Sequence, residues 1–185
     1  MTEKTARLYE RVRGFREQQR ERPARIEKPA PGQESVWDYP RPPRTEDVAK
    51  RVRVEFAGEI IAETGEAKRV LETSGAPVYY VPPRDLRTAL LEENPLHQTI
   101  CEWKGPARYW FVRSGDRLIE NAGWSYPDPF PGYEEIRDYV AFYPALVDCF
   151  VGDIQVKPQP GGFYGGWVTP EIVGPIKGEP GSEGW

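Results

Sequence analysis

A thiol, a carboxylate, an indole and an amine lie within five residues of this sequence, in the pentapeptide CEWKG. In a regular strand Cys101 and Trp103 would share one face and Glu102 and Lys104 the other, so pairing the thiol with the amine requires a bend. Gly105-Pro106 can supply it. We therefore expect Cys101 and Trp103 to pack inward, and Lys104 to stand at a pocket rim where its ammonium can meet an anionic group. The alternative is an exposed lysine paired with Glu102.

Cys101 would need a neighbouring base to act as a nucleophile. The single imidazole of the chain, His97, lies four residues upstream across an expected loop-to-strand junction. This spacing does not favour a Cys-His dyad, and a free cysteine is more often a small buried hydrophobe. With Cys149 as the one other cysteine, we expect two free thiols in a reducing compartment.

The segment ESVWDYPRPP at 34–43 gathers a second set of chemically useful side chains. It holds the carboxylates Glu34 and Asp38, the rings Trp37 and Tyr39, and the guanidinium of Arg41. Its three prolines favour an extended backbone, so the segment should run along an edge or over a groove. Arg41 could bind a carboxylate or phosphate through two hydrogen bonds, or it could pair internally with Glu34 or Asp38.

Aromatic residues are dense in the stretch that follows the pentapeptide, and strand alternation would divide them between two faces of a sheet. One face can fill the core while the other lines a pocket, although a core role is the commoner one. The six residues are Trp103, Tyr109, Trp110, Phe111, Trp124 and Tyr126.

Several familiar functional motifs are missing from the sequence. The glycine-rich run GGFYGG at 161–166 lacks the Lys-Ser/Thr ending of a phosphate-binding loop, and no GxSxG nucleophile elbow occurs. One histidine and no CxxC pair cannot supply the four ligands of a structural zinc, whereas a catalytic metal held by carboxylates stays open. The sequence leaves the cofactor and the oligomeric state undetermined.

Charge is distributed unevenly along the chain, whose formal net charge is -4. Residues 1–30 carry nine Lys and Arg against five Asp and Glu, which leaves an acidic body near -8. Such a body repels a phosphate backbone, so nucleic acid is a poor partner for it, although the basic arm keeps a small residual chance. No apolar run approaches the roughly 18–20 residues that cross a bilayer, and the start lacks an apolar signal region. We expect a soluble, cytoplasmic protein with no membrane partner.

The pattern predicts three parts: a charged arm and linker at 1–33, a β-rich domain at 34–157, and a Gly/Pro/aromatic extension at 158–185. In the arm, Leu8, Val12 and Phe15 form a thin helical stripe, and a solvated, partly frayed helix over Thr2 to Glu21 is favoured over a partner-docking one. The domain should be mainly β, an antiparallel sandwich or barrel-like fold.

Individual elements follow from local patterns. Val52–Phe56 alternates apolar and polar residues and should return through a turn at Ala57-Gly58-Glu59 into Ile60-Ile61-Ala62. One short helix is predicted from Pro83 to Leu91. Further strands are expected at Val78–Val81, Thr99–Trp103, Ala107–Arg113, Arg117–Tyr126, Arg137–Phe142 and Cys149–Val156. The rings of the extension, Phe163, Tyr164, Trp167 and Trp185, predict an ordered arm over the β body.

Five motifs occur in an order that resembles the domain-of-unknown-function 427 family, which some catalogues label nucleotidyltransferase-like. They are ESVWDYPRPP, VLETSGAPVYYVPPRD at 70–85, TICEWKGPARYW at 99–110, NAGWSYPDP at 121–129 and YVAFYP at 139–144. The resemblance covers about residues 33–157, and the tail looks like the extension of the bacterial long form. It implies a small pseudo-barrel or tent-like arrangement of antiparallel strands with a pocket. The motif residues carried over are Glu34, Trp37, Tyr39, Arg41, Tyr80, Cys101, Lys104, Trp124 and Tyr126.

The label alone does not establish chemistry. A common nucleotidyltransferase needs a Gly-Ser turn followed by paired carboxylates that hold two Mg²⁺ ions, and Asp148 with Asp153 makes an unconvincing pair.

Three hypotheses about function remain. The first is a small-molecule-binding domain, with a cage of Trp37, Tyr80, Trp124 and Tyr126 and with Arg41 and Lys104 as cationic anchors for an anionic or planar ligand. The second is an enzyme on a small anionic or nucleotide-like substrate that uses Lys104, Cys101 and Glu34. The third is a protein-interaction module that uses the strip at 37–43 and the extension.

Overall fold

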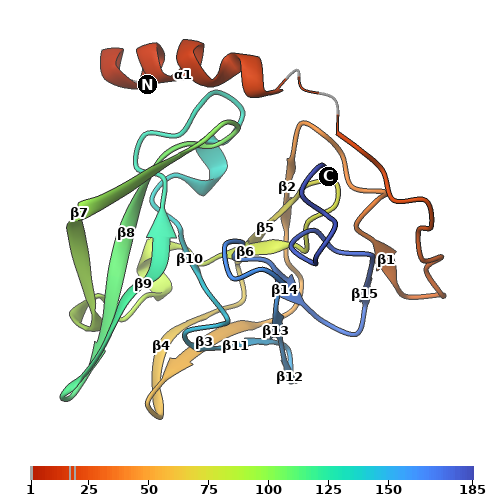
Figure 1. The fold of residues 1–185 in the computed structure, drawn as a ribbon. Coiled ribbons are helices and arrows are strands. Elements are labelled where there is room, and N and C mark those ends of the chain that lie inside the picture. Colours follow the sequence, from red (N-terminus) through yellow and green to blue (C-terminus); the bar gives the residue numbers. More distant parts are fainter. Residues whose placement is uncertain (1, 17, 19) are drawn as a thin grey trace.

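The computed structural model describes residues 2–16, 18 and 20–185, and its architecture is mainly β (Figure 1). The single α-helix of this part of the chain is α1 (Glu3–Arg16), and short 3₁₀ turns are η1 (Pro83–Asp85), η2 (Thr88–Leu90) and η3 (Glu134–Ile136). The strands are β1 (Glu34–Ser35), β2 (Arg44–Asp47), β3 (Val52–Phe56), β4 (Glu59–Thr64), β5 (Lys68–Leu71), β6 (Val78–Tyr80), β7 (Leu91–Cys101), β8 (Gly105–Ser114), β9 (Arg117–Ser125), β10 (Val140–Phe142), β11 (Asp148–Val151), β12 (Ile154–Gln155), β13 (Lys157–Pro158), β14 (Trp167–Val168) and β15 (Ile172–Val173).

The strands form open sheets that meet at an angle. Two sheets have four strands, in the orders β10-β9-β8-β7 and β12-β11-β3-β4, and a third has the order β2-β5-β6. The pairs β13-β14 and β1-β15 complete the set, the latter being parallel. The expected pseudo-barrel is therefore wrong in one respect, because no sheet among the described residues closes. The end of β6 meets β10 through an isolated bridge between Val81 and Val140, and the two sheets stay separate.

The hairpin predicted from local pattern is confirmed. β3 and β4 pair with Phe56 opposite Glu59, across a turn at Ala57 and Gly58. Both turn residues have positive φ, 53° and 80°, which matches the right-handed twist of the strands that they connect.

The helix expected from Pro83 to Leu91 does not form. In its place are the turns η1 and η2, and Leu91 already begins β7. The reason is a tertiary one: the Arg87 amide donates to the Ile61 carbonyl at 2.8 Å, and Leu86 bridges to Ala62. These backbone groups pair with β4 and not with their own chain four residues back.

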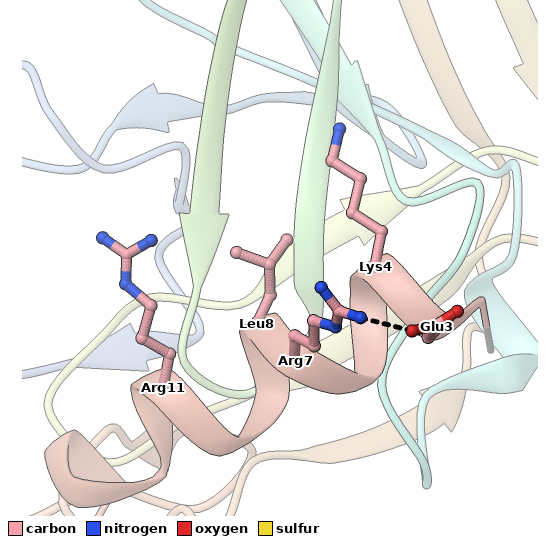
Figure 2. Close-up of a pocket in the computed structure, with 5 residues that line it drawn as sticks. All are labelled: Glu3, Lys4, Arg7, Leu8 and Arg11. Atoms are coloured by element: carbon pink, nitrogen blue, oxygen red, sulfur yellow. Dashed lines mark hydrogen bonds and ion pairs between the residues drawn. The ribbon is translucent and has the colours of Figure 1, made fainter.

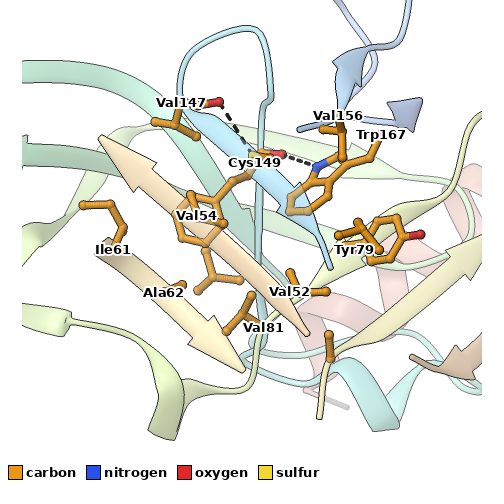
Figure 3. Close-up of a cluster of buried hydrophobic side chains, with 14 of the residues drawn as sticks. Val52, Val54, Ile61, Ala62, Tyr79, Val81, Val147, Cys149, Val156 and Trp167 are labelled. Atoms are coloured by element: carbon orange, nitrogen blue, oxygen red, sulfur yellow. Dashed lines mark hydrogen bonds between the residues drawn. The ribbon is translucent and has the colours of Figure 1, made fainter. Parts of the chain in front are cut away.

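The extension is built into the largest core (Figure 3). Trp167 has no exposed surface, stacks on Tyr79 with ring centroids 4.9 Å apart, and donates from Nε1 to the Phe142 carbonyl at 2.9 Å. It packs among valines of β3 and β11, so this ring belongs to the core of the β body. Phe163, by contrast, is 75% exposed.

The N-terminal helix lies against the body and is not the solvated helix that the sequence favoured (Figure 1). Thr5 and Val12 are buried, and the Tyr9 ring meets Phe130 edge to face at 5.0 Å. The predicted stripe contributes Val12, while Phe15 faces solvent. Positions 17 and 19 of the predicted helix lie outside the described residues. Within the described part of the chain, no helix is long and apolar enough to span a membrane.

Candidate functional site

The pentapeptide CEWKG forms the turn of the β7-β8 hairpin, where Cys101 pairs with Gly105. The Phe130 amide donates to the Lys104 carbonyl at 3.0 Å and holds this turn against the segment that follows β9. Gly105 has a φ of 105°, and a Cβ there would lie 3.2 Å from the Phe130 nitrogen. A glycine is needed here, because the backbones approach closely in a conformation that side chains disfavour. The sequence suggested a bend at Gly105-Pro106, and in the structure the chain reverses direction between Cys101 and Gly105.

Lys104 does not stand at a rim, because the turn directs it into the interior with 8% of its surface exposed. Burial acts to lower the pKa of Lys104, but nearby Cys101, Tyr80 and Glu72 outweigh it and raise the pKa above its ordinary value. The direction of this shift favours the charged form of the Lys104 side chain. Among the described residues, no hydrogen bond or ion pair reaches its ammonium.

Tyr80 from β6 brings a buried hydroxyl to the same centre. The residue has no exposed surface, and its Oη has no hydrogen-bond partner in the described chain. Burial raises the pKa of Tyr80 to about 12, against the opposing effect of Lys104. Trp124 also lowers that pKa slightly, but no hydrogen bond of acceptable geometry joins the indole to the hydroxyl. Tyr80 is therefore a neutral, unsatisfied donor beside a cation.

Aromatic rings enclose this pair. Trp124 and Tyr126 each lie with their ring centroids 6.4 Å from that of Tyr80, and burial raises the pKa of Tyr126 well above its ordinary value. Together with Trp103 and Tyr133 these rings belong to one buried cluster, against which Cys101 packs partly exposed. We call Lys104, Tyr80 and the rings Trp103, Trp124, Tyr126 and Tyr133 the lysine centre.

Trp37 and Tyr39 do not join the other predicted cage residues. They belong to a separate cluster, in which Trp37 Nε1 donates to the Pro175 carbonyl at 2.8 Å and its ring meets Trp185 at 5.4 Å. Parallel pairing of β1 with β15 draws this segment toward the extension. The expected four-ring cage is therefore corrected to one without Trp37.

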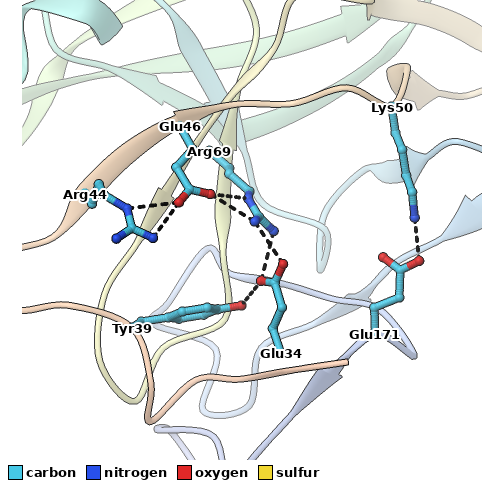
Figure 4. A network of polar contacts seen from close by, with 7 residues as sticks. All are labelled: Glu34, Tyr39, Arg44, Glu46, Lys50, Arg69 and Glu171. Carbon is cyan, nitrogen blue, oxygen red and sulfur yellow. Dashed lines mark hydrogen bonds and ion pairs between the residues drawn. The ribbon is translucent and has the colours of Figure 1, made fainter. Parts of the chain in front are cut away.

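Glu34 likewise lies in a different network, with Arg69 of β5 (Figure 4). Arg69 donates two hydrogen bonds to its carboxylate, at 2.9 and 3.1 Å, and Tyr39 Oη donates a third at 2.7 Å. Burial acts to raise the pKa of Glu34, but the hydrogen bonds from Arg69 and Tyr39 lower it below its ordinary value. A carboxylate held ionised in this way is a structural anchor and a poor proton carrier.

We expect Glu34→Gln to reduce stability in a pH-dependent way. A depressed carboxyl pKa stabilises the folded state above the ordinary value of 4.5, and this contribution is lost as the pH falls through the lower folded value. Urea denaturation at pH 7 should show a loss of about 1 kcal/mol for this partly exposed pair, which vanishes in acid. An equal loss at pH 7 and pH 3 would contradict the ionic contribution.

Arg41 borders the lysine centre, where its guanidinium lies against Trp103. Its Nη1 donates to Glu72 at 2.8 Å, its Nη2 lies 3.5 Å from the Glu102 carboxylate, and its guanidinium covers the Trp103 ring at 5.1 Å. Trp103 Nε1 donates to the same Glu72 oxygen at 3.1 Å. Glu102 thus pairs with arginine and not with Lys104. Glu72 lies within the motif at 70–85 but was not singled out by the sequence reasoning, because its partners Arg41 and Trp103 are distant in the chain.

The remaining predicted positions carry no evident chemistry. The His97 ring packs on Tyr109 at 4.3 Å, at the bulge of β7. In the described ranges, no group of three His, Cys, Asp or Glu side chains is placed to hold a metal ion. A hollow of about 360 Å³ lies along one face of α1 (Figure 2), and one of about 430 Å³ lies beside the β3-β4 turn. Neither is lined by residues of the lysine centre, and the first is only the solvated surface of a helix.

A known protein family matches the part of the chain that contains most of these residues. The family model described as a domain of unknown function (DUF427) matches residues 44–153, more than half of the chain. The matched range contains the lysine centre, while Glu34, Trp37, Tyr39 and Arg41 lie just before it. No curated protein matches the chain.

Proposed function

This chain belongs to the DUF427 family, and we propose that it binds a small, planar, anionic ligand at the lysine centre. One observation carries the proposal: the Tyr80 hydroxyl is buried without a hydrogen-bond partner in the described chain, and no hydrogen bond or ion pair from the described residues reaches the ammonium of Lys104, a residue only 8% exposed. A buried hydroxyl with no partner costs about 1–3 kcal/mol, and a buried cation without one costs more. A native protein that keeps such groups requires an explanation for them, and a bound ligand that pairs with both is one.

The chemistry of the pair selects an anion. The ammonium and the phenol can both donate, and one carboxylate can accept from both through charge-assisted bonds. Negative charge on the ligand also compensates the buried cation, which Glu72 does only from a distance. The surrounding rings favour a flat body, since Trp124 and Tyr126 offer aromatic surface around Tyr80.

Two segments cover this centre. Gly165 of the extension lies directly against Trp124, and Arg16 of the N-terminal arm covers the Trp103 ring at 5.2 Å. The ligand therefore enters when one of these segments moves aside. Cys101, which packs against the cluster, is itself partly exposed.

The competing hypotheses receive less support. The enzymatic one used Glu34 as proton carrier, and Glu34 is bound by Arg69 and Tyr39. The interaction module needed an exposed strip at 37–43, and both Trp37 and Tyr39 are buried within the monomer. We therefore favour the binding of a small ligand over the other two functions.

Benzoate and 4-hydroxybenzoate are suitable probes, measured by thermal unfolding at constant ionic strength. A ligand at a hundredfold excess over its Kd should stabilise the folded protein by about 2.7 kcal/mol. We expect a concentration-dependent rise in Tm that disappears in Lys104→Met. Lys157→Met, which removes an exposed lysine, should retain it.

Tyr80→Phe separates binding from folding. Removal of an unsatisfied hydroxyl should leave the free protein equally stable or up to about 1 kcal/mol more stable, while ligand affinity falls about tenfold. A flat response of the wild-type protein, or an undiminished shift in Lys104→Met, would contradict the proposal.

A further inference from the structure

Three arginines, two from the N-terminal arm and one from the strip at 37–43, converge on Glu102. Arg16 of α1 donates from Nε to the Glu102 carbonyl at 2.6 Å, and Arg20 Nη2 lies 3.8 Å from the Glu102 carboxylate. Arg41 reaches the same carboxylate at 3.5 Å and also covers the indole. The arm and the body therefore meet through guanidinium groups.

These guanidinium groups keep buried N–H donors that nothing in the described chain accepts. Arg16 Nη2, Arg20 Nε, and both Nε and Nη2 of Arg41 have no hydrogen-bond partner. The Arg41 Nη2 contact with Glu102 has the distance of an ion pair without the geometry of a hydrogen bond. Because a buried, unpaired donor on a charged group is costly, four of them in one place indicate that an acceptor belongs between them.

The local charge also favours a bound anion at this place. The extension adds Lys177, whose pKa is lowered by burial and by the positive charges of Arg20 and Arg41. With Arg16, four cations then surround the two carboxylates Glu72 and Glu102, in a chain whose net charge is -4. Cations that repel one another in an otherwise acidic protein are stabilised by an anion.

We propose that Arg16, Arg20 and Arg41 form a binding site for the phosphate group of a small molecule, and that this site is complete only when the arm is docked. Phosphate suits the donors because its oxygens accept from several planar guanidinium groups at once, and Arg is the residue best shaped for it. The site adjoins the lysine centre at Trp103 but does not rest on the function proposed for that centre.

A polymeric phosphate is disfavoured by the surroundings. The chain outside its first 30 residues is acidic, and such a surface repels a nucleic acid backbone at long range. A compact phosphate monoester avoids that repulsion, and Trp103 offers it an apolar surface next to the arginines.

Isothermal titration with inorganic phosphate and with phenyl phosphate, at fixed ionic strength in chloride, tests the site. We expect saturable binding that weakens at least tenfold in Arg41→Gln and in the double variant Arg16→Gln/Arg20→Gln. The matched control is Arg11→Gln/Arg13→Gln, which removes the same charge from exposed positions of the same N-terminal arm and should change affinity less than twofold. Tighter binding of phenyl phosphate than of phosphate would identify a monoester as the ligand.

Trypsin gives a second readout on the full chain, because the arm is rich in arginine. Phosphate should slow cleavage of the arm several-fold in the wild-type protein and in Lys104→Met, but not in Arg41→Gln. The proposal is overturned if wild-type protein shows no saturable binding or the control weakens as much as the site variants. Tighter, steeply salt-dependent binding of a single-stranded oligonucleotide would overturn it in favour of nucleic acid.

Discussion

Trp167→Ala should lower the free energy of unfolding by about 3–5 kcal/mol, the cost of removing a large ring from a closed core. The ring has no exposed surface, stacks on Tyr79 and belongs to the same buried cluster as the valines of β3 and β11 (Figure 3). The substitution also leaves the Phe142 carbonyl without its donor. Urea denaturation followed by far-ultraviolet circular dichroism measures the change without depending on tryptophan fluorescence.

Phe163→Ala is the matched control, since this ring lies in the same extension but is 75% exposed. It should change stability by less than about 0.5 kcal/mol. A loss below 1 kcal/mol for Trp167→Ala would mean that the extension is an appendage, and not part of the cooperative core.

Gly165→Ala should destabilise the protein by about 1–3 kcal/mol through a steric clash. A Cβ at this position would lie 2.1 Å from Cη2 of Trp124, far inside van der Waals contact, and neither group can turn away easily in a buried cluster. Either the indole shifts within the lysine centre or the extension lifts from it. Urea denaturation gives the stability, and tryptophan emission should move to longer wavelength if the indole becomes wetter.

Gly65→Ala serves as the control for this substitution. A Cβ at Gly65 would meet nothing within 4 Å, and its backbone does not need a glycine. This variant should match the wild-type protein in stability, or gain slightly through a less flexible unfolded chain. Equal stability of the Gly165 variant would contradict the close packing of the extension on Trp124.

These two substitutions bear on the proposed ligand site as well as on the fold. Trp167 anchors the extension in the main core, and two residues earlier Gly165 covers the lysine centre. Loosening the cover without removing the anchor should make the centre easier to reach. The binding proposal therefore predicts a role of the extension in access to the centre, in addition to its role in stability.

Local patterns in the sequence determined the hairpin of β3 and β4, the mainly antiparallel character of the domain, and the family. Alternation and turn residues act between neighbours in the chain, so they can be recognised without knowing what packs against them. The same patterns failed at residues 83–91, where backbone groups that could have formed a helix pair with β4.

The composition of the candidate site was predictable in part. Tyr80, Cys101, Lys104, Trp124 and Tyr126 were predicted from motifs, and the structure brings them together. Their arrangement was decided by the tertiary structure, because a lysine is exposed or buried according to what its turn is packed against. Here the contact between Phe130 and Lys104 turned the side chain inward.

Partners that come from afar could not be found in the sequence at all. Glu34 is engaged by Arg69, Trp37 by the extension, and Arg41 by Glu72, each across more than thirty residues of chain. The three arginines of the proposed phosphate site likewise come from α1, from the linker and from the strip before β2. Spacing along a chain encodes local geometry, whereas such contacts arise only when separate segments fold onto one body.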